Sequence, residues 1–430
     1  MKKYMVAIAL ALVSTPGMAK IVGQMTPAEP LAEARIGQLP ASERQPWLSY
    51  LERSRALMAA DKAALAAERN GIPVPQGPGD GRGGGDGMPF DRAAGWYASV
   101  EARHVADNIV SFQTPAGGWG KNQNRAGPLR ARGQGYVPVE NLPAYAAGDI
   151  QVEDAGWRYV GTIDNGATIT EMRFLARVQA QFPGTEGEEY RAAFLKGARY
   201  LLAAQFPNGG WPQVFPLQGG YHDALTYNDG AVSQVAMLML DIARRKDDFA
   251  FVPAVIASEA EGAAARARDI ILATQVLVDG KRTIWGQQHD ALTLAPVGAR
   301  NFEPAALSTD ESVDLLQFLI KQPRRTPEIE AAIRDGVDWL RTHALHDVEW
   351  TKRPDGPQGR RLIAKPGADP IWARFYDLRT AKPVYGDRDR SIHDDVNELS
   401  VERRNGYSWF SASPAKLIRA YDGRVRPVGG

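Results

Sequence analysis

The sequence predicts an all-α fold, an α/α toroid built from repeated helix hairpins with long irregular loops that form a cleft. Hydrophobic residues recur at helical spacing through most of the chain after residue 90, whereas period-two alternation is scarce. A Gln-x-Pro-x-Gly-Gly-Trp turn occurs at 113–119 and again at 205–211, with a weaker third copy at 275–287. Helix hairpins that each bury one face against the next can close into a ring, which is the basis for predicting a toroid.

The predicted helices follow one another along the chain, each with apolar residues on one face. Thr168-x-x-Glu171 and Ser308-x-x-Glu311 match the capping-box pattern and are expected to begin two of them. Each repeated turn lies at the end of a helix, where glycine lets the chain reverse and tryptophan can fill the space between helices. The predicted helical ranges are 48–68, 96–110, 169–178, 190–206, 230–242, 263–276, 312–320, 329–345 and 414–421.

The first 19 residues have the three parts of an export signal in the required order. Two lysines supply a charged start, an apolar run at 6–13 is too short to span a bilayer, and Gly17-Met18-Ala19 provides a cleavage site. We therefore expect residues 1–19 to be a signal peptide and the mature protein to be secreted or periplasmic. No cysteine is present, so export implies neither a disulfide framework nor a thiolate metal site.

Three further segments complete the predicted organisation. Residues 20–76 contain an alanine-rich helical pattern, and the sequence does not indicate the role of this N-terminal helical segment. Residues 77–89 contain seven glycines and can bury almost no apolar surface, so they are expected to form a linker. The domain that carries the repeats is expected to occupy residues 90–430.

Composition and charge narrow the possible partners. The chain is 44% hydrophobic and 23% charged, which is ordinary for a globular protein. We expect the mature protein to be a monomer that is not bound to a membrane. Removing residues 1–19 takes away two lysines and no acids, so 51 basic and 50 acidic residues become 49 and 50. A nearly neutral chain lacks the broad basic excess of nucleic-acid binders, and we expect no nucleic acid partner.

A second repeat suggests a cation site. Thr162-Ile-Asp164-Asn-Gly-Ala is echoed by Thr226-Tyr-Asn-Asp229-Gly-Ala, and Asp164 and Asp229 are expected to occupy equivalent places in the two copies. Short side chains with oxygen atoms suit a hard cation such as Ca²⁺, which takes roughly six to eight oxygen ligands in flexible geometry. A single aspartate here could simply cap the following helix. Because two copies share the same flanks, the pattern favours a cation site.

Seven motifs follow one another between residues 93 and 422. They are GGWGKN at 117–122, TIDNGAT at 162–168, NGGWPQVFP at 208–216, TYNDGA at 226–231, ARNFEP at 299–304, WARFYDL at 372–378 and ERRNGYSWF at 402–410. Together they resemble the pectate lyases of polysaccharide lyase family 10. The resemblance implies an α/α toroid and an enzyme that cleaves de-esterified homogalacturonan by β-elimination with the help of calcium. Residues 90–430 would then be the catalytic domain.

The resemblance also implies the roles of individual residues. Elimination removes the C5 proton of galacturonate, which is acidic because it lies next to the C6 carboxylate, and negative charge then builds up on that carboxylate. Cations around it stabilise this charged state more than the ground state. By resemblance, Asp164 and Asp229 hold calcium, and Asp164 also contacts substrate. Arg374 and Arg388 bind substrate carboxylates, and Arg300 is the catalytic base.

An arginine base requires an unusual pKa. Arginine titrates at about 12.5 to 13.8, so keeping it neutral at a pH of about 9 costs roughly 5 to 7 kcal/mol. We expect calcium, Arg374 and Arg388 to lower the pKa of Arg300, because each disfavours a further positive charge nearby. Desolvation by a bound polymer should act in the same direction. The sequence therefore predicts an alkaline pH optimum.

Other polar and aromatic residues of the motifs have two possible roles. Lys121, Asn165 and Asn228 could contact the sugar acids or could form hydrogen bonds with the backbone. The tryptophans of the repeated turns could stack on sugars, but core packing is the commoner role for tryptophan at a helix turn.

Three alternative functions share parts of this pattern. Asp164 and Asp229 could be the acid and base of an inverting glycoside hydrolase on an acidic polysaccharide, since many such enzymes are toroids with two separated carboxylates. The arginines favour a uronate and a lyase over a neutral-sugar hydrolase. A carbohydrate-binding module would retain the polymer and form no product. Triterpene cyclases share the Gln-x-x-x-Gly-x-Trp spacing, but the chain has no Asp-x-Asp-Asp initiator.

Overall fold

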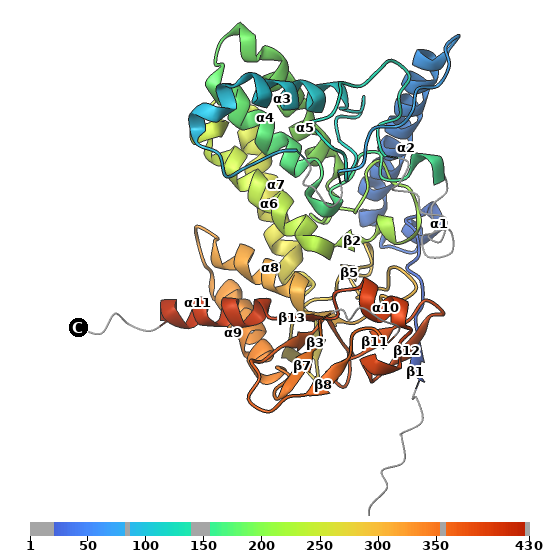
Figure 1. Cartoon of the computed structure of the whole chain (residues 1–430), viewed down its shortest axis with the longest axis vertical. Helices are drawn as coiled ribbons and strands as arrows, with labels where there is room; N and C mark the ends of the chain where they lie inside the picture. The colour runs from blue at the N-terminus through green and yellow to red at the C-terminus, as the bar shows by residue number, and fades with distance from the viewer. Residues whose placement is uncertain (1–20, 82–86, 139–154, 353–357, 426–430) are drawn as a thin grey trace, which may run out of the picture.

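Helices arranged in two rows form the centre of the structure. The computed structural model describes residues 21–81, 87–138, 155–352 and 358–425, so the predicted signal peptide lies outside the described residues. One row consists of α4 (Ile169–Gln181), α6 (Ala231–Arg244) and α8 (Thr309–Ile320), and the other of α5 (Glu188–Ala204), α7 (Ala254–Ala273) and α9 (Pro327–Thr342). Helices contact their neighbours along each row and their partners across the rows. In Figure 1 the pairs descend from α4 and α5 through α6 and α7 to α8 and α9.

Further helices extend this arrangement at both ends. Helix α3 packs against α4 and α5, and α11 packs against α8 and α9. The bounds are α1 (Glu33–Ile36), α2 (Ala41–Arg69), α3 (Val100–Ser111), α10 (Val401–Gly406) and α11 (Ser413–Val425). The 3₁₀ helices are η1 (Ala94–Ala98), η4 (Ala155–Trp157), η5 (Asp164–Gly166), η6 (Thr185–Gly187), η7 (Gly220–Asp223), η8 (Asn228–Gly230), η9 (Asp247–Phe249) and η10 (Val396–Glu398).

The strands among the described residues are short, with two to four residues each. All of the pairings are antiparallel. β1 (Ile21–Gln24) and β11 (Tyr385–Gly386) flank β12 (Ser391–His393), and the two-stranded pairs are β2 (Leu225–Thr226) with β5 (Gln288–His289), β3 (Leu277–Val278) with β4 (Lys281–Arg282), β6 (Leu307–Ser308) with β10 (Phe375–Tyr376), β7 (Val348–Trp350) with β8 (Leu362–Ala364) and β9 (Trp372–Ala373) with β13 (Phe410–Ser411). The predicted helical class is therefore confirmed in its general form, whereas closure of the helices into a toroid stays a prediction.

Most predicted helices are found near their predicted ranges, but two of them begin more than one helical turn earlier. α7 begins at Ala254 instead of residue 263, and three of its nine additional residues are alanine, which leaves a weak hydrophobic pattern. α2 begins at Ala41 instead of residue 48 and contains Pro46, a residue type that argues against a helix interior. Tertiary packing outweighs local sequence preference at both places.

The two predicted capping boxes mark the starts of α4 and α8 correctly, but their hydroxyl groups bond elsewhere. Neither Thr168 nor Ser308 caps its helix with its side chain. The Thr168 hydroxyl instead accepts a hydrogen bond from the backbone N–H of Trp119 at 3.1 Å and donates to the carbonyl of Thr162 at 2.8 Å. The Ser308 hydroxyl donates to the carboxylate of Glu311. These side chains hold the repeated turns and the acidic loops together.

The repeated glutamines make equivalent hydrogen bonds in all three copies of the turn. Each side-chain amide donates to a carbonyl within its own turn and to a carbonyl of a helix in the α5, α7 and α9 row. The contacts to these helices are Gln113 to Ala193 on α5, Gln205 to Ala263 on α7 and Gln275 to Ala332 on α9, at 2.9–3.0 Å. The weak third copy in the sequence is therefore a full copy in the structure.

The tryptophans of the three turns pack in the core, as expected for residues at helix turns. Trp119, Trp211 and Trp285 are completely buried. The indole N–H of each donates to a backbone carbonyl of a preceding helix at 2.7–2.8 Å. Trp372 makes the same type of bond to the carbonyl of Leu340 on α9 at 2.7 Å. This fourth position lacks the glutamine and glycine pattern, so the sequence did not reveal it.

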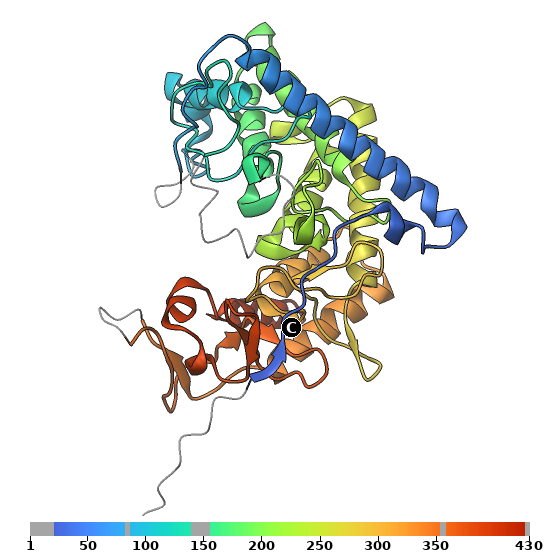
Figure 2. The ribbon, with the colours of Figure 1, turned by 90° about the vertical axis from the view of Figure 1, so that its right-hand side faces the viewer.

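The N-terminal segment packs along the molecule from one end to the other. β1 pairs with β12 near the C-terminus, and Arg35 binds Asp290. α2 then crosses the upper helices (Figure 2). The hydroxyl of Tyr50 on α2 donates to the carbonyl of Ala204 at 3.0 Å. Several apolar residues of this segment belong to the main hydrophobic core. The described part of this segment, 21–76, thus packs into the core of the fold, although its limits as a separate unit stay a prediction.

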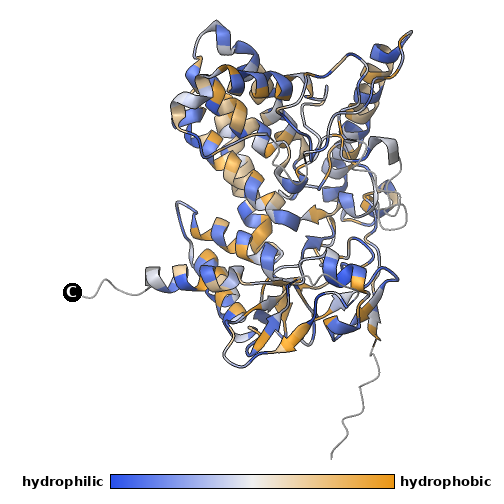
Figure 3. Cartoon of the chain, in the orientation of Figure 1, coloured by the Kyte–Doolittle hydropathy of each residue, from blue (hydrophilic) through white to orange (hydrophobic). Residues whose placement is uncertain are grey.

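The described parts of the predicted linker, 77–81 and 87–89, contact the helical domain. The backbone N–H of Gly81 donates to the carbonyl of Asn122 at 2.8 Å, and the side chain of Met88 is buried in the main core. That core runs through the two rows of helices, of which α6 and α7 carry many apolar residues (Figure 3). Among the described residues, no helix combines the length and hydrophobicity needed to cross a bilayer.

Candidate active site

The two acidic loops have the same backbone conformation, but the acids of the two loops do not occupy the same position in it. In η5, Asn165 has φ 52° and ψ 28°, and in η8, Asp229 has φ 51° and ψ 29°. Asn and Asp are the non-glycine residues that most readily adopt this left-handed conformation. Asp229 therefore corresponds to Asn165, and Asn228 corresponds to Asp164. The expectation that Asp164 and Asp229 occupy equivalent places is wrong, because acid and amide are exchanged between the copies.

Asp164 is buried and fully engaged with polar partners. Its carboxylate pairs with the ammonium group of Lys121 and accepts a hydrogen bond from Gln213 Nε2 at 3.0 Å. The amide of Asn228 lies 3.4 Å from the same carboxylate. Burial alone would raise the pKa of Asp164, but the charge and hydrogen bond of Lys121 outweigh it and lower the pKa. Asp164 and Lys121, two predicted substrate-binding residues, thus form an ion pair with each other.

Asp229 is the more accessible of the two acids. Its side chain is 44% exposed, and one carboxylate oxygen accepts a hydrogen bond from Asn228 Nδ2 at 2.9 Å. Loss of hydration and the negative charge of Asp164 raise the pKa of Asp229 to about 6, against the opposing effect of Arg374. An excess of negative charge therefore surrounds a carboxylate that is open to solvent. Asn165, its structural counterpart, donates a hydrogen bond to Asn122 Oδ1 at 3.1 Å.

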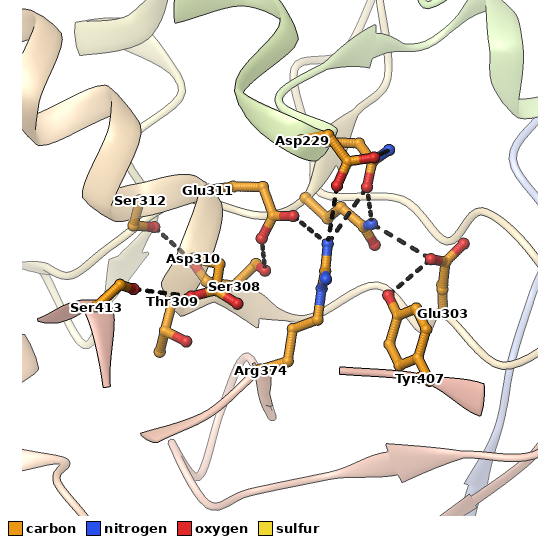
Figure 4. A network of polar contacts seen from close by, with 12 residues as sticks. Asp229, Glu303, Ser308, Thr309, Asp310, Glu311, Ser312, Arg374, Tyr407 and Ser413 are labelled. Atoms are coloured by element: carbon orange, nitrogen blue, oxygen red, sulfur yellow. Dashed lines mark hydrogen bonds and ion pairs between the residues drawn. The ribbon is translucent and has the colours of Figure 1, made fainter. Parts of the chain in front are cut away.

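Arg374 reaches the acidic loops from the C-terminal strands. It lies between β9, which pairs with β13, and β10, which pairs with β6, so its backbone is fixed from both sides. Its guanidinium pairs with Glu311 at the start of α8 and lies 3.9 Å from the carboxylate of Asp229 (Figure 4). Burial would lower the pKa of Arg374, but Glu311 outweighs this effect and raises it. Arg374 is consequently a permanent positive charge beside Asp229.

Arg300 is held by a carboxylate that the sequence did not single out. Its backbone N–H, Nε and Nη2 donate to the two oxygens of Glu303 at 3.0, 2.8 and 2.6 Å. Glu303 is buried, and although burial raises its pKa, the charge of Arg300 lowers the value to about 2. Burial would likewise lower the pKa of Arg300, but Glu303 raises it well above the usual range. The expected lowering of the Arg300 pKa is therefore wrong for these surroundings, because the nearest charge is negative.

Hydrogen bonds connect Arg300 to the acidic loops through Glu303. Gln287 Nε2 donates to Glu303 Oε1 at 3.3 Å and also to the side-chain oxygen of Asn228. The hydroxyl of Tyr407 donates to the same Glu303 oxygen at 2.7 Å (Figure 4). Glu303 and Tyr407 belong to the ARNFEP and NGYSWF motifs. Their place in these motifs is the signal that could have indicated them.

A cavity of about 330 Å³ lies where these elements meet. The predicted residues Asp229, Arg300 and Arg374 line it, together with Asn228 and Tyr407. The cavity is completed by Arg360, Asn405, Gly406 and Ser408. It is therefore a polar cavity with three guanidinium groups and one partly exposed carboxylate on its walls, and such a surface suits a multiply charged anionic ligand.

Arg388 lies near this cavity but does not line it. Its guanidinium forms two hydrogen bonds with Glu402, at 3.0 and 3.1 Å. It also lies 5.3 Å from the centroid of the Phe302 ring, against which Arg300 packs at 4.8 Å. The structure thus places Arg388 beside Arg300 through a shared aromatic side chain. Lys121, Asp164 and Asn165 are not among the residues that line the cavity, although Asp164 contacts the lining residue Asn228.

The donor atoms at this site suit a hard cation, but the protein ligands form only part of a coordination shell. Among the residues described, no group of three or more His, Cys, Asp or Glu side chains is placed to hold a metal ion. Asp229 offers an accessible carboxylate with a raised pKa, which a nearby cation would stabilise in its charged form. Asp164 is already paired with Lys121. The arrangement therefore fits a cation completed by ligands from substrate or water.

Comparison with known proteins identifies the family. The family model for pectic acid lyases matches residues 113–418. A family 10 polysaccharide lyase from Cellvibrio cellulosa has a similar structure, with a TM-score of 0.64 and 32% identity over 79% of this chain and 97% of that chain. A mutant of this lyase in complex with trigalacturonic acid matches with the same TM-score and identity, over 79% of this chain and 98% of the mutant chain. No curated protein matches the chain.

The chain belongs to the pectic acid lyase family, within family 10 of the polysaccharide lyases. The predictions of this family and of a pectate lyase enzyme are thereby confirmed. Family membership also decides against a glycoside hydrolase, a terpene cyclase and a binding module without activity. The residues before 113 lie outside the matched range, which begins at the first Gln-x-Pro-x-Gly-Gly-Trp turn.

Proposed function

We propose that this pectate lyase cleaves de-esterified homogalacturonan by calcium-assisted β-elimination in the cavity between the acidic loops and the C-terminal strands. The observation that carries this proposal is the meeting of Asp229, Arg300 and Arg374 on the wall of one cavity. A uronate polymer brings a carboxylate on every sugar, and guanidinium groups bind carboxylates through paired hydrogen bonds. The bound trigalacturonic acid in the mutant of the Cellvibrio lyase supports an oligogalacturonate ligand.

Arg374 and Arg388 would bind substrate carboxylates, and Lys121, Asp164 and Asn165 would contact neighbouring sugars. Arg374 is fixed by two strand pairs and by Glu311, so it can meet the C6 carboxylate without reorganisation of the protein. Charge that builds up on this carboxylate is stabilised by a guanidinium that stays protonated at every working pH. This residue would therefore contribute to the rate as well as to binding.

Calcium would be held by Asp229, with Asp164 behind it, and would supply positive charge next to the substrate carboxylate. The exposed Asp229 carboxylate binds a cation best when it is ionised. Because its pKa is raised to about 6, calcium binding should weaken as the pH falls below that value. This dependence is consistent with an enzyme that works at alkaline pH.

Arg300 would be the base that removes the C5 proton. It lines the cavity, and its side chain is 36% exposed, so the guanidinium is accessible to substrate. Glu303 orients it with three hydrogen bonds and at the same time raises its pKa. The neutral form is therefore scarce, and the rate should rise as the pH approaches the pKa of Arg300. An alkaline pH optimum follows from this ion pair.

We also propose that the helix pairs belong to an α/α toroid and that the protein is an exported monomer. The chain would lose residues 1–19 as a signal peptide and act in the periplasm or outside the cell, without membrane or nucleic acid partners. The order of charged, apolar and small residues at the start of the chain supports export. Equivalent hydrogen bonds in the three glutamine turns support a repeated architecture.

Absorbance measurements test the proposed function directly. Elimination leaves an unsaturated sugar that absorbs in the near ultraviolet, whereas hydrolysis leaves none. On polygalacturonate, we expect absorbance to grow with calcium present and to stop when a chelator is added. Growth of reducing ends without absorbance would contradict elimination, and undiminished absorbance with chelator would contradict the role of calcium. A chelated sample to which excess calcium is returned serves as the control.

A further inference from the structure

The proposed elimination leaves one chemical requirement without a residue. When the bond between C4 and O4 breaks, the electron pair stays on O4, and a sugar alkoxide is a poor leaving group unless it receives a proton. The cavity walls offer guanidinium groups, amides, a serine, one tyrosine and the carboxylate of Asp229, which is ionised at alkaline pH and has no proton to give. Guanidinium groups are needed as cations, and amides and serine are far weaker acids than a phenol. Tyr407 is therefore the strongest candidate proton donor on these walls.

Tyr407 is held rigidly at the cavity by its ring and by its hydroxyl. It follows α10, and its ring packs against Phe302 at 5.1 Å and Trp409 at 4.8 Å between centroids. The guanidinium carbons of Arg374 and Arg300 lie 5.0 and 5.7 Å from the same ring centroid. The tyrosine is thus the aromatic residue around which the two cationic residues of the site are arranged.

A single carboxylate oxygen connects Tyr407 with the proposed base. Glu303 Oε1 accepts a hydrogen bond from the Tyr407 hydroxyl at 2.7 Å and another from Arg300 Nη2 at 2.6 Å. Glu303 itself is buried, with 2% of its side chain exposed. A buried carboxylate that bridges two groups in one cavity can pass a proton between them as well as orient them.

We propose that Tyr407 is the general acid that protonates O4 of the leaving galacturonate, and that Glu303 returns a proton from Arg300 to Tyr407 after each turnover. This inference rests on the proposed function, since it names the second proton-transfer group of the same elimination. Tyr407 touches the substrate in this role, whereas Glu303 acts through Arg300 and Tyr407.

Atoms and charges balance in the proposed cycle. The C5–H bond breaks and its proton goes to neutral Arg300, while the electron pair forms the double bond between C4 and C5. The C4–O4 bond breaks, its electron pair remains on O4, and O4 takes the hydroxyl proton of Tyr407. Arg300 is now protonated and Tyr407 is a phenolate. Transfer of one proton from Arg300 through Glu303 to Tyr407 restores both groups without an external acid or base.

The surroundings of Tyr407 suit an acid that works at alkaline pH. Burial raises the pKa of Tyr407 well above its usual value, and Glu303 adds to this effect, whereas Arg374 opposes it. The hydroxyl therefore keeps its proton well into the alkaline range. Once the proton is given away, Arg374 and Arg300 lie close enough to stabilise the phenolate.

The test compares two leaving groups with the full-length enzyme and calcium. The variant Tyr407→Phe removes only the hydroxyl, and the substrates are polygalacturonate and a galacturonate that carries a 4-nitrophenyl group on O4. A nitrophenolate leaves without help from an acid. We expect kcat on polygalacturonate to fall by about 10²- to 10⁴-fold with KM within about threefold, as for loss of a general acid. On the nitrophenyl substrate we expect a rate within about threefold of wild type.

Controls separate this inference from folding defects and from the proposed function. Tyr50→Phe also loses a buried hydroxyl bond, but on α2, and should keep both rates near wild type. An equal loss on both substrates by Tyr407→Phe would overturn the acid role, and so would full activity on polygalacturonate. If wild type releases nitrophenol and forms unsaturated oligosaccharides, the proposed function stands whatever the variant does. A wild type without unsaturated product would refute both proposals.

Discussion

Replacement of Glu303 by glutamine should lower the folding stability of the protein and should shift the pH dependence of its activity. The two effects can be measured separately. Glutamine keeps the volume of the side chain but removes the charge that pairs with Arg300 and accepts from Tyr407. The lowering of the Glu303 pKa from 4.5 to about 2 corresponds to about 3 kcal/mol of folding stability. Arg300 is partly exposed, so water can hydrate its charge after the substitution. We therefore expect a loss of about 2 to 3 kcal/mol at neutral pH.

The pH dependence of this loss follows from the sign of the shift. A carboxyl group whose pKa is lowered by folding stabilises the protein above its unfolded pKa, and this contribution disappears as the pH falls through the folded pKa. The difference between wild type and Glu303→Gln should therefore be full above pH 4.5 and should shrink toward pH 2. Urea denaturation at several pH values measures it. A difference that is equally large at pH 3 and pH 7, or absent at pH 7, would refute the ion-pair argument.

The same variant tests how Glu303 acts on the proposed base. Because Glu303 raises the pKa of Arg300, its removal should lower that pKa and make the neutral form available at lower pH. We expect the rising limb of kcat/KM against pH to move to lower pH in Glu303→Gln. Turnover should still be lower overall, because orientation of the base and return of the proton are lost. Glu402→Gln, which removes the partner of Arg388 at the protein surface, should leave the limb unmoved and serves as the control.

Three further predictions concern other contacts of the site and the fold. Arg374→Ala should lower kcat/KM on polygalacturonate by at least about 10²-fold in steady-state kinetics, because it removes a fixed guanidinium and leaves Glu311 buried without its partner. Arg374→Lys should recover little of the lost activity. Asp229→Asn should weaken calcium binding at pH 8, and in wild type this binding should decline below a pH of about 6, which calorimetry can measure. Arg35→Ala should cost about 1 to 2 kcal/mol in urea denaturation, because Asp290 loses its partner beneath the N-terminal segment; unchanged stability would show that this contact is not needed.

The helical part of the fold could be predicted because its signal is local. Apolar residues at helical spacing indicated most helices, and the glutamine and tryptophan turns indicated that pairs of helices repeat. The signal failed where small residues carry the packing, as in the first half of α7. It also failed at Trp372, whose position in the repeat is defined by a hydrogen bond to Leu340 and by no neighbouring motif. Contacts between distant segments leave no periodic trace in the sequence.

The candidate site could be predicted in its residue types but not in its partners. The motifs indicated Arg300, Arg374 and Asp229, which the structure brings to one cavity. They did not indicate that Glu303 pairs with Arg300, although the two residues lie only three positions apart. The pKa of a side chain depends on the nearest charge in space, and here a buried carboxylate outweighs the more distant cations. The role of the arginine as a base is consequently tied to high pH.

The shifted correspondence of the acidic loops has a similar cause. TIDNGA and TYNDGA look alike when their acids are aligned, but the backbone places the left-handed residue one position after Asp164 and at Asp229. One acid is therefore buried against Lys121, and the other is open to solvent. The duplication builds the loops, whereas the exchange of acid and amide gives them different roles.

The most direct test of the account is the initial rate of unsaturated product formation by Arg300→Lys, measured from pH 7 to pH 11 with calcium and polygalacturonate. Lysine keeps a positive charge at this position, so substrate binding and electrostatic stabilisation should be largely retained. Removal of the C5 proton should be affected more strongly. We predict a loss of at least about 10²-fold in kcat at alkaline pH with a smaller change in KM. The melting temperature should stay close to that of wild type. Turnover within about threefold of wild type across this range would contradict the assignment of Arg300 as the base.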